Sequence, residues 1–489
     1  MFAYFAIFSY FSCFSLIING LLLLNFLLFV ISYPQLNSSA VRSVQNIAKL
    51  AFLYIFILVC VFFFLKLYCY SILRLVSGYF VWYSYFGICS VASANPGAIY
   101  LPLFSDAVVF LAIFLSLFCW VLLSERSLLE NYFNLSYFTV FIFFTTNMVY
   151  SVNLLHMFLF FEFLFLPSLY FVYILGYSKR VDRSVFYLLT WTYLGSLISL
   201  VGLIYIYSIY KSCNILLLLQ LSFSTYERTI LFWCFFLGFG VKVPLWPFHY
   251  WLTKVHVEAP AGFSVFLSGF LVKTALYCLY FFTILFTDQV SKLIASVIIF
   301  WGFLDASIRM WAVQDIKKLI AFATIQEMNL ILLFLFLSTN HTLVVLNLFI
   351  VVHGLLSGLL FFLVDQVQKR AQTRDINILS GFAAKLTILP LFIWLGILVF
   401  RGFPLFIKFF VEWELLLLIF ESYRVVGAGL FLVGTVISIV GFARAWLTVL
   451  YGQPRLQHLQ AVDMLKKDIY IASAFIVILF YLNFYLLLF

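Results

Sequence analysis

Apolar runs of roughly 20 residues, long enough to cross a bilayer as helices, recur along the whole chain, from Phe2–Ile31 to Tyr470–Phe489. The composition excludes a soluble protein, because 66% of the 489 residues are hydrophobic and 9% are charged. Soluble domains carry about a quarter charged residues. The pattern therefore predicts an all-α polytopic membrane protein with about 14 transmembrane helices and no room for a soluble domain.

The basic residues predict how the chain is oriented. Although the formal net charge is +10, the lysines and arginines lie in short connections between spans, which indicates membrane orientation and no nucleic-acid partner. Connections after even-numbered spans hold few of them: Arg74, Lys211, Arg228, Lys292 and Arg424. This alternation places both termini on the side away from the basic connections. The first residues lack the features of a signal or transit peptide, so we expect the first apolar run to be a retained span.

Five ionisable residues fall inside apolar runs: Glu162, Lys242, Lys273, His353 and Glu412. A charge at the bilayer centre costs at least ~3 kcal/mol, so such residues normally face protein or water and pair with one another. Lysine suits proton transfer, because burial and a neighbouring carboxylate act on its proton in opposite directions. The alternative for any one of them is a static ion pair that fixes helix register.

Proline interrupts the helices beside two of these charges. Pro244 and Pro247 follow Lys242 and cannot donate to the carbonyls of Gly240 and Val243, so we expect open backbone acceptors there. The sequence Gly402-Phe403-Pro404 repeats the pattern shortly before Glu412. Two interrupted helices with charges beside them are typical of a transporter's path.

His249 and His256 lie seven residues apart on one helical face, and we interpret them as interfacial residues rather than metal or haem ligands. The eight cysteines are scattered with no C-x-x-C spacing, so we interpret them as packing residues. The chain contains no dinucleotide fingerprint, P-loop or nucleophile elbow. We therefore predict that this chain itself binds no nucleotide, flavin or metal.

At these same residues the sequence resembles the antiporter-like membrane subunits of respiratory complex I. Three segments carry the resemblance: Val241–Pro260, Gln314–Phe322, and the pair of Phe161-Glu162 with Phe270–Thr274. The resemblance extends from about residue 100 to 460, whereas the first hundred residues match poorly.

The resemblance implies two inverted five-helix repeats with discontinuous helices 7 and 12, broken at Pro244, Pro247 and Pro404. It also implies a domain organisation of divergent N-terminal transmembrane helices (1–100), a proton-translocating core (101–460) and a C-terminal transmembrane helix (461–489). On this resemblance the proton-translocating residues are Glu162, Lys242, Lys273, His353 and Glu412.

The function implied by the resemblance is proton translocation across the mitochondrial inner membrane, driven by electron transfer from NADH to ubiquinone. NADH, FMN, iron–sulfur clusters and ubiquinone are then expected in other subunits, with no cofactor and no catalytic residue in this chain. The expected partners are other membrane-arm subunits, including antiporter-like paralogues, and membrane lipids. A secondary monovalent cation/proton antiporter and a non-pumping structural subunit stay open as alternatives.

The chain departs from the family pattern in the second half. The segment Gln326-Glu327-Met328 stands where relatives usually show Ser-His-Met, so Glu327 replaces a histidine and becomes an additional relay candidate together with His249. Lys408 and Val411 replace the asparagine and glycine often seen before the terminal glutamate. Glu414 therefore competes with Glu412 for that position.

Overall fold

The protein is all-helical in the part of the chain that the computed structural model describes, which comprises residues 101–123, 128–176, 181–286, 288–338, 342–452 and 462–486. Within these ranges the chain forms helices, short connections and two isolated bridges, and no strand. The predicted all-α class is confirmed. The spans predicted within residues 1–100 lie outside the described residues.

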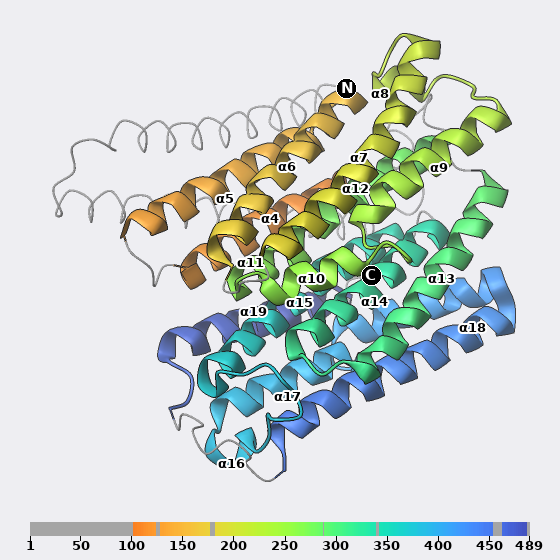
Figure 1. Ribbon diagram of the computed structural model, residues 1–489. Helices are drawn as coiled ribbons and strands as arrows, with labels where there is room; N and C mark the ends of the chain where they lie inside the picture. Colours follow the sequence, from red (N-terminus) through yellow and green to blue (C-terminus); the bar gives the residue numbers. More distant parts are fainter. Residues whose placement is uncertain are drawn as a thin grey trace.

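After α4 (Leu101–Leu123), the first half of the described chain crosses the bundle five times (Figure 1). A short helix, α8 (Ile215–Leu218), lies in a connection. The crossings are formed by α5 (Leu128–Val149), α6 (Leu154–Leu175), α7 (Val181–Tyr210), the interrupted pair α9 (Thr225–Lys242) and α10 (Tyr250–Glu258), and the continuous run of α11 (Ala261–Phe266), η3 (Leu267–Leu271) and α12 (Val272–Phe286).

The second half repeats this order, again with its fourth crossing interrupted. One element, α18, contains two helices joined at Arg424, whose backbone is non-helical. Because five crossings are an odd number, the second set begins at the opposite end from the first, as inverted repeats require. Its elements are α13 (Gln289–Ala312), α14 (Ile316–Leu337), α15 (Leu343–Ala371), α16 (Phe382–Lys385) in a connection, α17 (Ile388–Phe400) and α18 (Ile407–Leu450), followed by α19 (Lys466–Leu486).

Helices dominate because lipid cannot hydrogen-bond the backbone, so each spanning segment must satisfy its own N–H and C=O groups. Among the described residues, seven helices are long and apolar enough to cross a membrane. Several begin at polar caps. Asn153 caps α6, Asp288 caps α13, Asp315 caps α14, and Ser224 forms a capping box with Glu227 at the start of α9. These caps satisfy N–H groups that the first helical turn leaves free.

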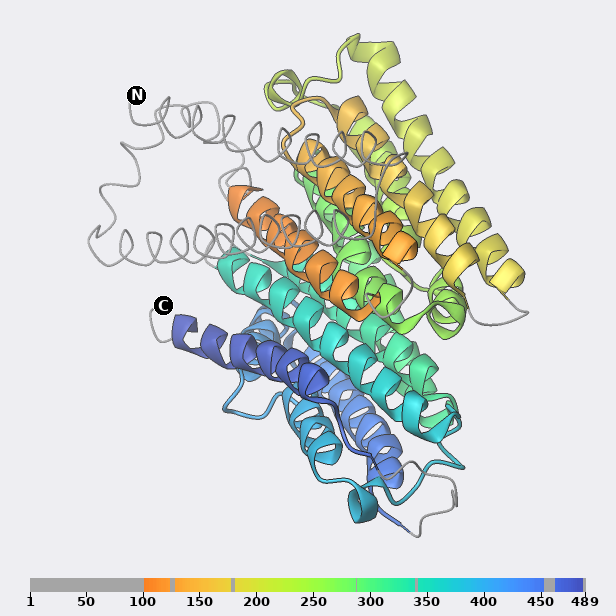
Figure 2. The ribbon, with the colours of Figure 1, turned by 90° about the vertical axis from the view of Figure 1, so that its left-hand side faces the viewer.

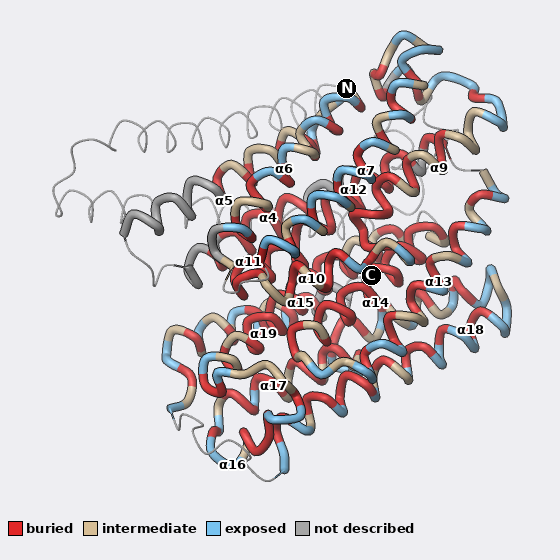
Figure 3. Tube along the Cα trace, viewed as in Figure 1, coloured by how far each residue is buried: buried red, intermediate tan, exposed pale blue. Residues whose placement is uncertain are grey.

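The core lies around α14 and α15. The most apolar window of α14 is 100% buried and that of α15 is 89% buried, whereas the corresponding window of α18 is only 33% buried (Figure 3). Helix α15 runs between the first half and the second half (Figure 2), and it packs against α4, α11, α14 and α19. Polar side chains in the middle of α14 and α15, such as Glu327 and His353, are therefore enclosed by protein.

The connections at each end of the bundle are tied together by backbone hydrogen bonds. At one end, an isolated bridge joins Asn153 to Asn214. At the other end, a second bridge joins Asp315 to Asp375. The second end also carries basic side chains that donate to backbone carbonyls of α10 and its C-terminus. Lys317 Nζ donates to the Ala259 carbonyl at 3.1 Å, and Arg374 donates to the Val257 carbonyl. Two of the segments that carry the family resemblance thus meet here.

A pair of glycines lets η3 approach α15 closely. A Cβ atom built on Gly354 would lie 2.9 Å from the Gly269 carbonyl oxygen and 2.8 Å from Leu111 Cδ2. A Cβ atom on Gly269 would lie 3.0 Å from the Gly354 carbonyl oxygen. Small residues at such crossings let helix backbones pack closely in membranes. The glycine pair therefore sets the spacing beside two buried ionisable residues, Lys273 and His353.

Replacing Gly354 with valine should separate η3 from α15, because a larger side chain has no space at this contact. We expect a loss of about 1 to 3 kcal/mol of stability, typical of overpacking. It would be measured as a lower midpoint of thermal aggregation in detergent. Gly429→Val is the matched control, since a Cβ there meets nothing within 4 Å. Equal midpoints for the two variants would contradict this account.

Asp463, in the connection before α19, caps α17 from a distant part of the chain. Its carboxylate accepts hydrogen bonds from the backbone N–H groups of Thr387 at 2.9 Å, Ile388 at 2.7 Å and Leu389 at 3.2 Å. Burial raises the pKa of Asp463, but these backbone hydrogen bonds outweigh it and hold the pKa below its ordinary value. The ionised carboxylate is therefore the form that stabilises the start of α17.

Replacing Asp463 with alanine should cost about 1 kcal/mol at neutral pH, the usual effect of losing a helix cap. The group has a depressed pKa in the folded protein, so its contribution is present above the ordinary aspartate pKa and disappears as pH falls through the folded value. We expect the difference in thermal midpoint between wild type and Asp463→Ala to shrink on acidification. A midpoint difference that stays constant as the pH falls would contradict this account.

Candidate functional site

A buried acid–lysine pair lies at the interruption of the fourth crossing. Lys242, the last residue of α9, places its Nζ 2.5 Å from Oε1 of Glu162 on α6. Ser196 on α7 donates to the other carboxylate oxygen at 2.7 Å. The side chain of Lys242 is 1% exposed and that of Glu162 is 29% exposed. The pair therefore has one fully enclosed member and one that reaches the edge of the bundle.

Aromatic rings complete the surroundings of Lys242. Its ammonium lies 4.3 Å from the ring centroid of Phe161 and 4.7 Å from that of Phe165. Both rings come from α6, as Glu162 does. An ammonium is attracted to the faces of aromatic rings, so these contacts offset part of the cost of burying the charge.

The helix is interrupted where the prolines predict it, between the end of α9 at Lys242 and the start of α10 at Tyr250. The expectation of an open acceptor at Gly240 is wrong, because its carbonyl accepts the N–H of Leu245 at 2.8 Å. The Val241 carbonyl accepts the indole N–H of Trp251 at 2.8 Å. A tight turn and one tryptophan thus satisfy the carbonyls of Gly240 and Val241, and the lysine ammonium is left to bind the carboxylate.

The two histidines of this segment are buried within the protein, and their interpretation as residues at the membrane interface stays a prediction. His249 is 4% exposed and His256 is 0% exposed. His249 Nε2 lies 3.6 Å from Oδ2 of Asp305, which also accepts from Arg309 Nε at 2.7 Å. His256 stacks on Phe361. Within the described residues, no group of three or more His, Cys, Asp or Glu side chains is arranged to hold a metal ion.

Lys273 is the second residue of α12, directly after the π-helical segment η3, and is 0% exposed. Its ammonium donates to the backbone carbonyl of Ser268, and the Ser268 hydroxyl lies 3.3 Å from that of Ser357 on α15. Single π-helical turns inside α-helices occur frequently at functional sites. Among the described residues, no hydrogen bond or ion pair joins Lys273 to the pair of Glu162 and Lys242.

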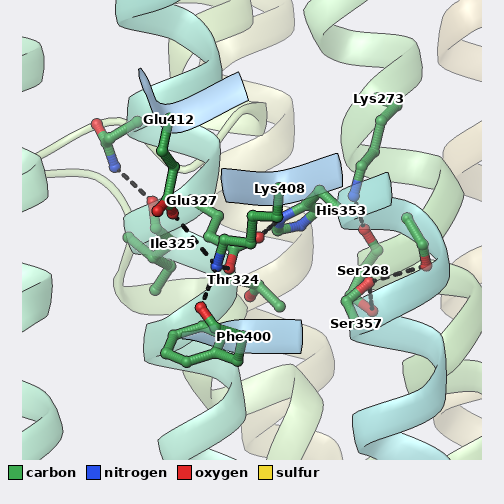
Figure 4. A network of polar contacts seen from close by, with 12 residues as sticks. Ser268, Lys273, Thr324, Ile325, Glu327, His353, Ser357, Phe400, Lys408 and Glu412 are labelled. Atoms are coloured by element: carbon green, nitrogen blue, oxygen red, sulfur yellow. Dashed lines mark hydrogen bonds and ion pairs between the residues drawn. The ribbon is translucent and has the colours of Figure 1, made fainter. Parts of the chain in front are cut away.

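A second cluster of buried charges lies in the other half of the protein (Figure 4). Glu327 on α14 binds two partners. One carboxylate oxygen lies 2.6 Å from Nδ1 of His353 on α15, and the other lies 2.5 Å from Nζ of Lys408 on α18. The side chains of all three residues are at most 3% exposed. Figure 4 shows His353 between Lys273 on one side and Glu327 with Lys408 on the other.

Lys408 also contacts the terminal glutamate. Its Nζ lies 3.5 Å from Oε1 of Glu412, one helical turn away, and donates to the Phe400 carbonyl at 2.5 Å. Of the two candidates for the terminal glutamate, the one that contacts Lys408 within the described residues is therefore Glu412 rather than Glu414. Phe400 ends α17 and Ile407 begins α18, so Pro404 lies inside the predicted second interruption.

Gly402 in this interruption supports Glu412. Its φ is +63°, a left-handed conformation that glycine adopts without strain, and a Cβ there would lie 2.8 Å from Glu412 Oε2. The loop backbone therefore packs directly against the carboxylate.

Sequence reasoning missed Lys408 and Asp305 as members of these clusters. Lys408 was visible as a departure from the family pattern, but its partner Glu327 lies 81 residues away in the sequence. Asp305 lies on α13 without a motif, and only the fold brings it near His249. The structure thus brings Glu162 together with Lys242, and His353, Glu327 and Glu412 together around Lys408.

Comparisons with known proteins agree with this architecture. The chain is 37% identical to NADH-ubiquinone oxidoreductase chain 4 of Paramecium tetraurelia over 321 residues, which cover 65% of this chain and 68% of that protein. It is 33% identical to chain 4 of Acanthamoeba castellanii, covering 64% and 63% of the two chains. Subunit M of the NADH-quinone oxidoreductase of Rickettsia conorii is 30% identical and covers 68% of each chain.

Solved structures share the fold at low sequence identity. A chain of the Mrp complex from Dietzia sp. superposes with a TM-score of 0.69 at 17% identity, covering 79% of this chain and 82% of that one. A chain of respiratory complex I from Thermus thermophilus superposes with a TM-score of 0.66 at 19% identity, covering 79% and 80%. Residues 151–438 match the family described as NADH:quinone oxidoreductase/Mrp antiporter, TM. The chain therefore belongs to this family of membrane proteins.

Proposed function

We propose that this chain is a proton-translocating membrane-arm subunit of respiratory complex I in the mitochondrial inner membrane. The observation that carries the proposal is the enclosed Lys242 ammonium, 2.5 Å from the Glu162 carboxylate at an interrupted helix. Electron transfer from NADH to ubiquinone, with its flavin and iron–sulfur centres, belongs on this proposal to other subunits. The relatives named chain 4 support the assignment.

The proposed mechanism begins at the acid–lysine pair. Glu162 is the partly exposed member, so a change of charge on a neighbouring subunit can reach it, whereas Lys242 is enclosed and responds through Glu162. When Glu162 is neutralised, Lys242 loses its counter-charge and releases its proton toward the interior. Enclosure makes this coupling strong, because few water molecules screen the two charges.

The proton then passes along the centre of the bundle. On this proposal Lys273 receives it, His353 relays it through its imidazole, and Glu412 releases it at the second interruption. His353 suits a relay because imidazole accepts a proton on one ring nitrogen and donates from the other. His249, with Asp305 at 3.6 Å, is an additional branch beside the first interruption. The order of the steps follows the positions of these residues along the bundle.

A cation/proton antiporter, or a subunit of one, is the second candidate. The family includes Mrp antiporters, and the fold of this chain also matches a chain of an Mrp complex. Transport by the purified, reconstituted chain driven by an imposed sodium gradient, without NADH, would favour this candidate. Co-migration of the chain with NADH dehydrogenase activity on a native gel would favour complex I. Mass spectrometry of the active band identifies the chain.

Replacing Lys242 with methionine should suppress NADH-driven proton pumping while the complex still assembles, because methionine fills a similar volume without the charge. Pumping is measured in vesicles by a pH-sensitive dye, and assembly by native-gel staining. The exposed Lys385→Met variant is the matched control and should pump normally. Full pumping by Lys242→Met would remove this residue from the mechanism.

Gly402→Ala tests whether the loop geometry at the second interruption matters for pumping. Alanine at a φ of +63° is strained by about 1 to 3 kcal/mol, and its Cβ would displace Glu412. We expect reduced pumping with retained assembly. Gly429→Ala, on the exposed face of α18, should leave pumping unchanged. Normal pumping by Gly402→Ala would show that the position of Glu412 is not critical.

A further inference from the structure

Glu327 and Lys408 form an acid–lysine pair in the second repeat that corresponds to the pair of Glu162 and Lys242 in the first, except that Lys242 precedes its interruption and Lys408 follows the second one. Glu162 lies on α6, the second crossing of its repeat, and Lys242 lies at the interruption of the fourth. Glu327 lies on α14, again the second crossing, and Lys408 lies at the interruption of the fourth. Both ammonium–carboxylate distances are 2.5 Å. The protein thus contains two acid–lysine pairs related by its internal repeat.

The surroundings of the two lysines also correspond. Each ammonium lies over aromatic rings: Lys242 over Phe161 and Phe165, and Lys408 over Phe400 at 4.2 Å. Lys242 ends α9, and the Lys408 ammonium, although carried on the first turn of α18, donates to the last carbonyl of α17, so each ammonium lies at the C-terminal end of a broken half-helix, where the helix dipole favours a cation.

The second pair differs from the first in having a third member. Lys408 lies between two carboxylates, at 2.5 Å from Glu327 and 3.5 Å from Glu412. One ammonium cannot neutralise two carboxylates, so one of the two acids is favoured to hold a proton. Which acid holds the proton depends on which one Lys408 contacts. The structure holds Lys408 close to Glu327, with Glu412 within reach on the next helical turn.

We propose that Lys408 is a charge shuttle that stays protonated and moves between Glu327 and Glu412, so that proton uptake at Glu327 drives proton release at Glu412. This inference rests on the proposed pumping function and adds a step to it. The cycle starts with Glu327 ionised and bound to Lys408, Glu412 protonated, and His353 carrying the incoming proton.

The steps conserve protons. His353 Nδ1 donates its proton to Glu327 across the 2.6 Å contact, leaving a neutral imidazole and a neutral carboxylic acid. The Lys408 ammonium, which has lost its counter-charge, moves to Glu412 and stabilises the carboxylate that forms as Glu412 releases its proton outward. The proton on Glu327 then passes to Glu412 as Lys408 returns to Glu327. One proton has entered from His353 and one has left from Glu412.

The test compares four variants in the assembled complex, with Lys242→Met as the benchmark for lost pumping. The variants are Lys408→Met, Glu327→Gln, the double variant Glu327→Gln with Lys408→Met, and Lys408→Arg. The double variant leaves neither an unpaired Glu327 nor an unpaired Lys408, so it is the variant best able to fold if a single variant does not. Assembly is followed by native-gel staining, and pumping is measured per NADH oxidised.

We expect the double variant to assemble and to pump no better than Lys242→Met, because the shuttle is absent. We expect Lys408→Arg to retain at least half of wild-type pumping, because arginine keeps a permanent charge and the shuttle never gives up its proton. Near-normal pumping by the double variant would show that Glu327 and Lys408 form only a structural ion pair. If Lys408→Arg assembles but pumps no better than Lys242→Met, Lys408 must instead lose a proton during the cycle.

These outcomes separate this inference from the proposed function. If Lys242→Met pumps normally, the pumping function assigned to the chain fails, whatever the other variants do. If Lys242→Met is inactive and the double variant pumps, the pumping function stands and the charge shuttle fails.

Discussion

The cost of an uncompensated charge in a medium without water governs how this protein is built. Each enclosed ammonium is held by a carboxylate, a backbone carbonyl or aromatic rings, and Lys408 has all three within reach. The interrupted helices supply this environment, because a helix that ends inside the bundle presents carbonyls to a cation. The helices are therefore broken where charges must be held. The glycine contact between η3 and α15 brings together the two helical segments that carry Lys273 and His353.

The two repeats share a plan but use it differently. In the first, a carboxylate at the edge of the bundle faces an enclosed lysine, an arrangement open to influence from a neighbour. In the second, Glu327, Lys408 and His353 are all enclosed, and Lys408 contacts two acids, Glu327 and Glu412. The first pair is suited to respond to a change of charge on a neighbouring subunit. The second cluster is suited to convert that response into release of a proton in one direction. Helix α15, which carries His353, lies at the seam between them.

Much of this arrangement could be predicted from the sequence. Hydropathy predicts the helices because the period of apolar residues and the length of a span are set by the bilayer. The prolines predict both interruptions, and the cost of buried charge predicts that Glu162 and Lys242 need partners. The sequence could not show that the Gly240 carbonyl is satisfied by Leu245, because this depends on how tightly the turn closes. Nor could it pair Lys408 with Glu327, because their contact depends on how α14 packs against α18.

The backbone contacts at the basic end of the bundle have a mechanical consequence. The end of α10 is held by Lys317 and Arg374, which both belong to the second repeat, whereas its other end adjoins the interruption beside Lys242. The second repeat therefore holds one end of the helix whose other end adjoins the first lysine, and the two repeats are connected through the backbone of α10 as well as through charge.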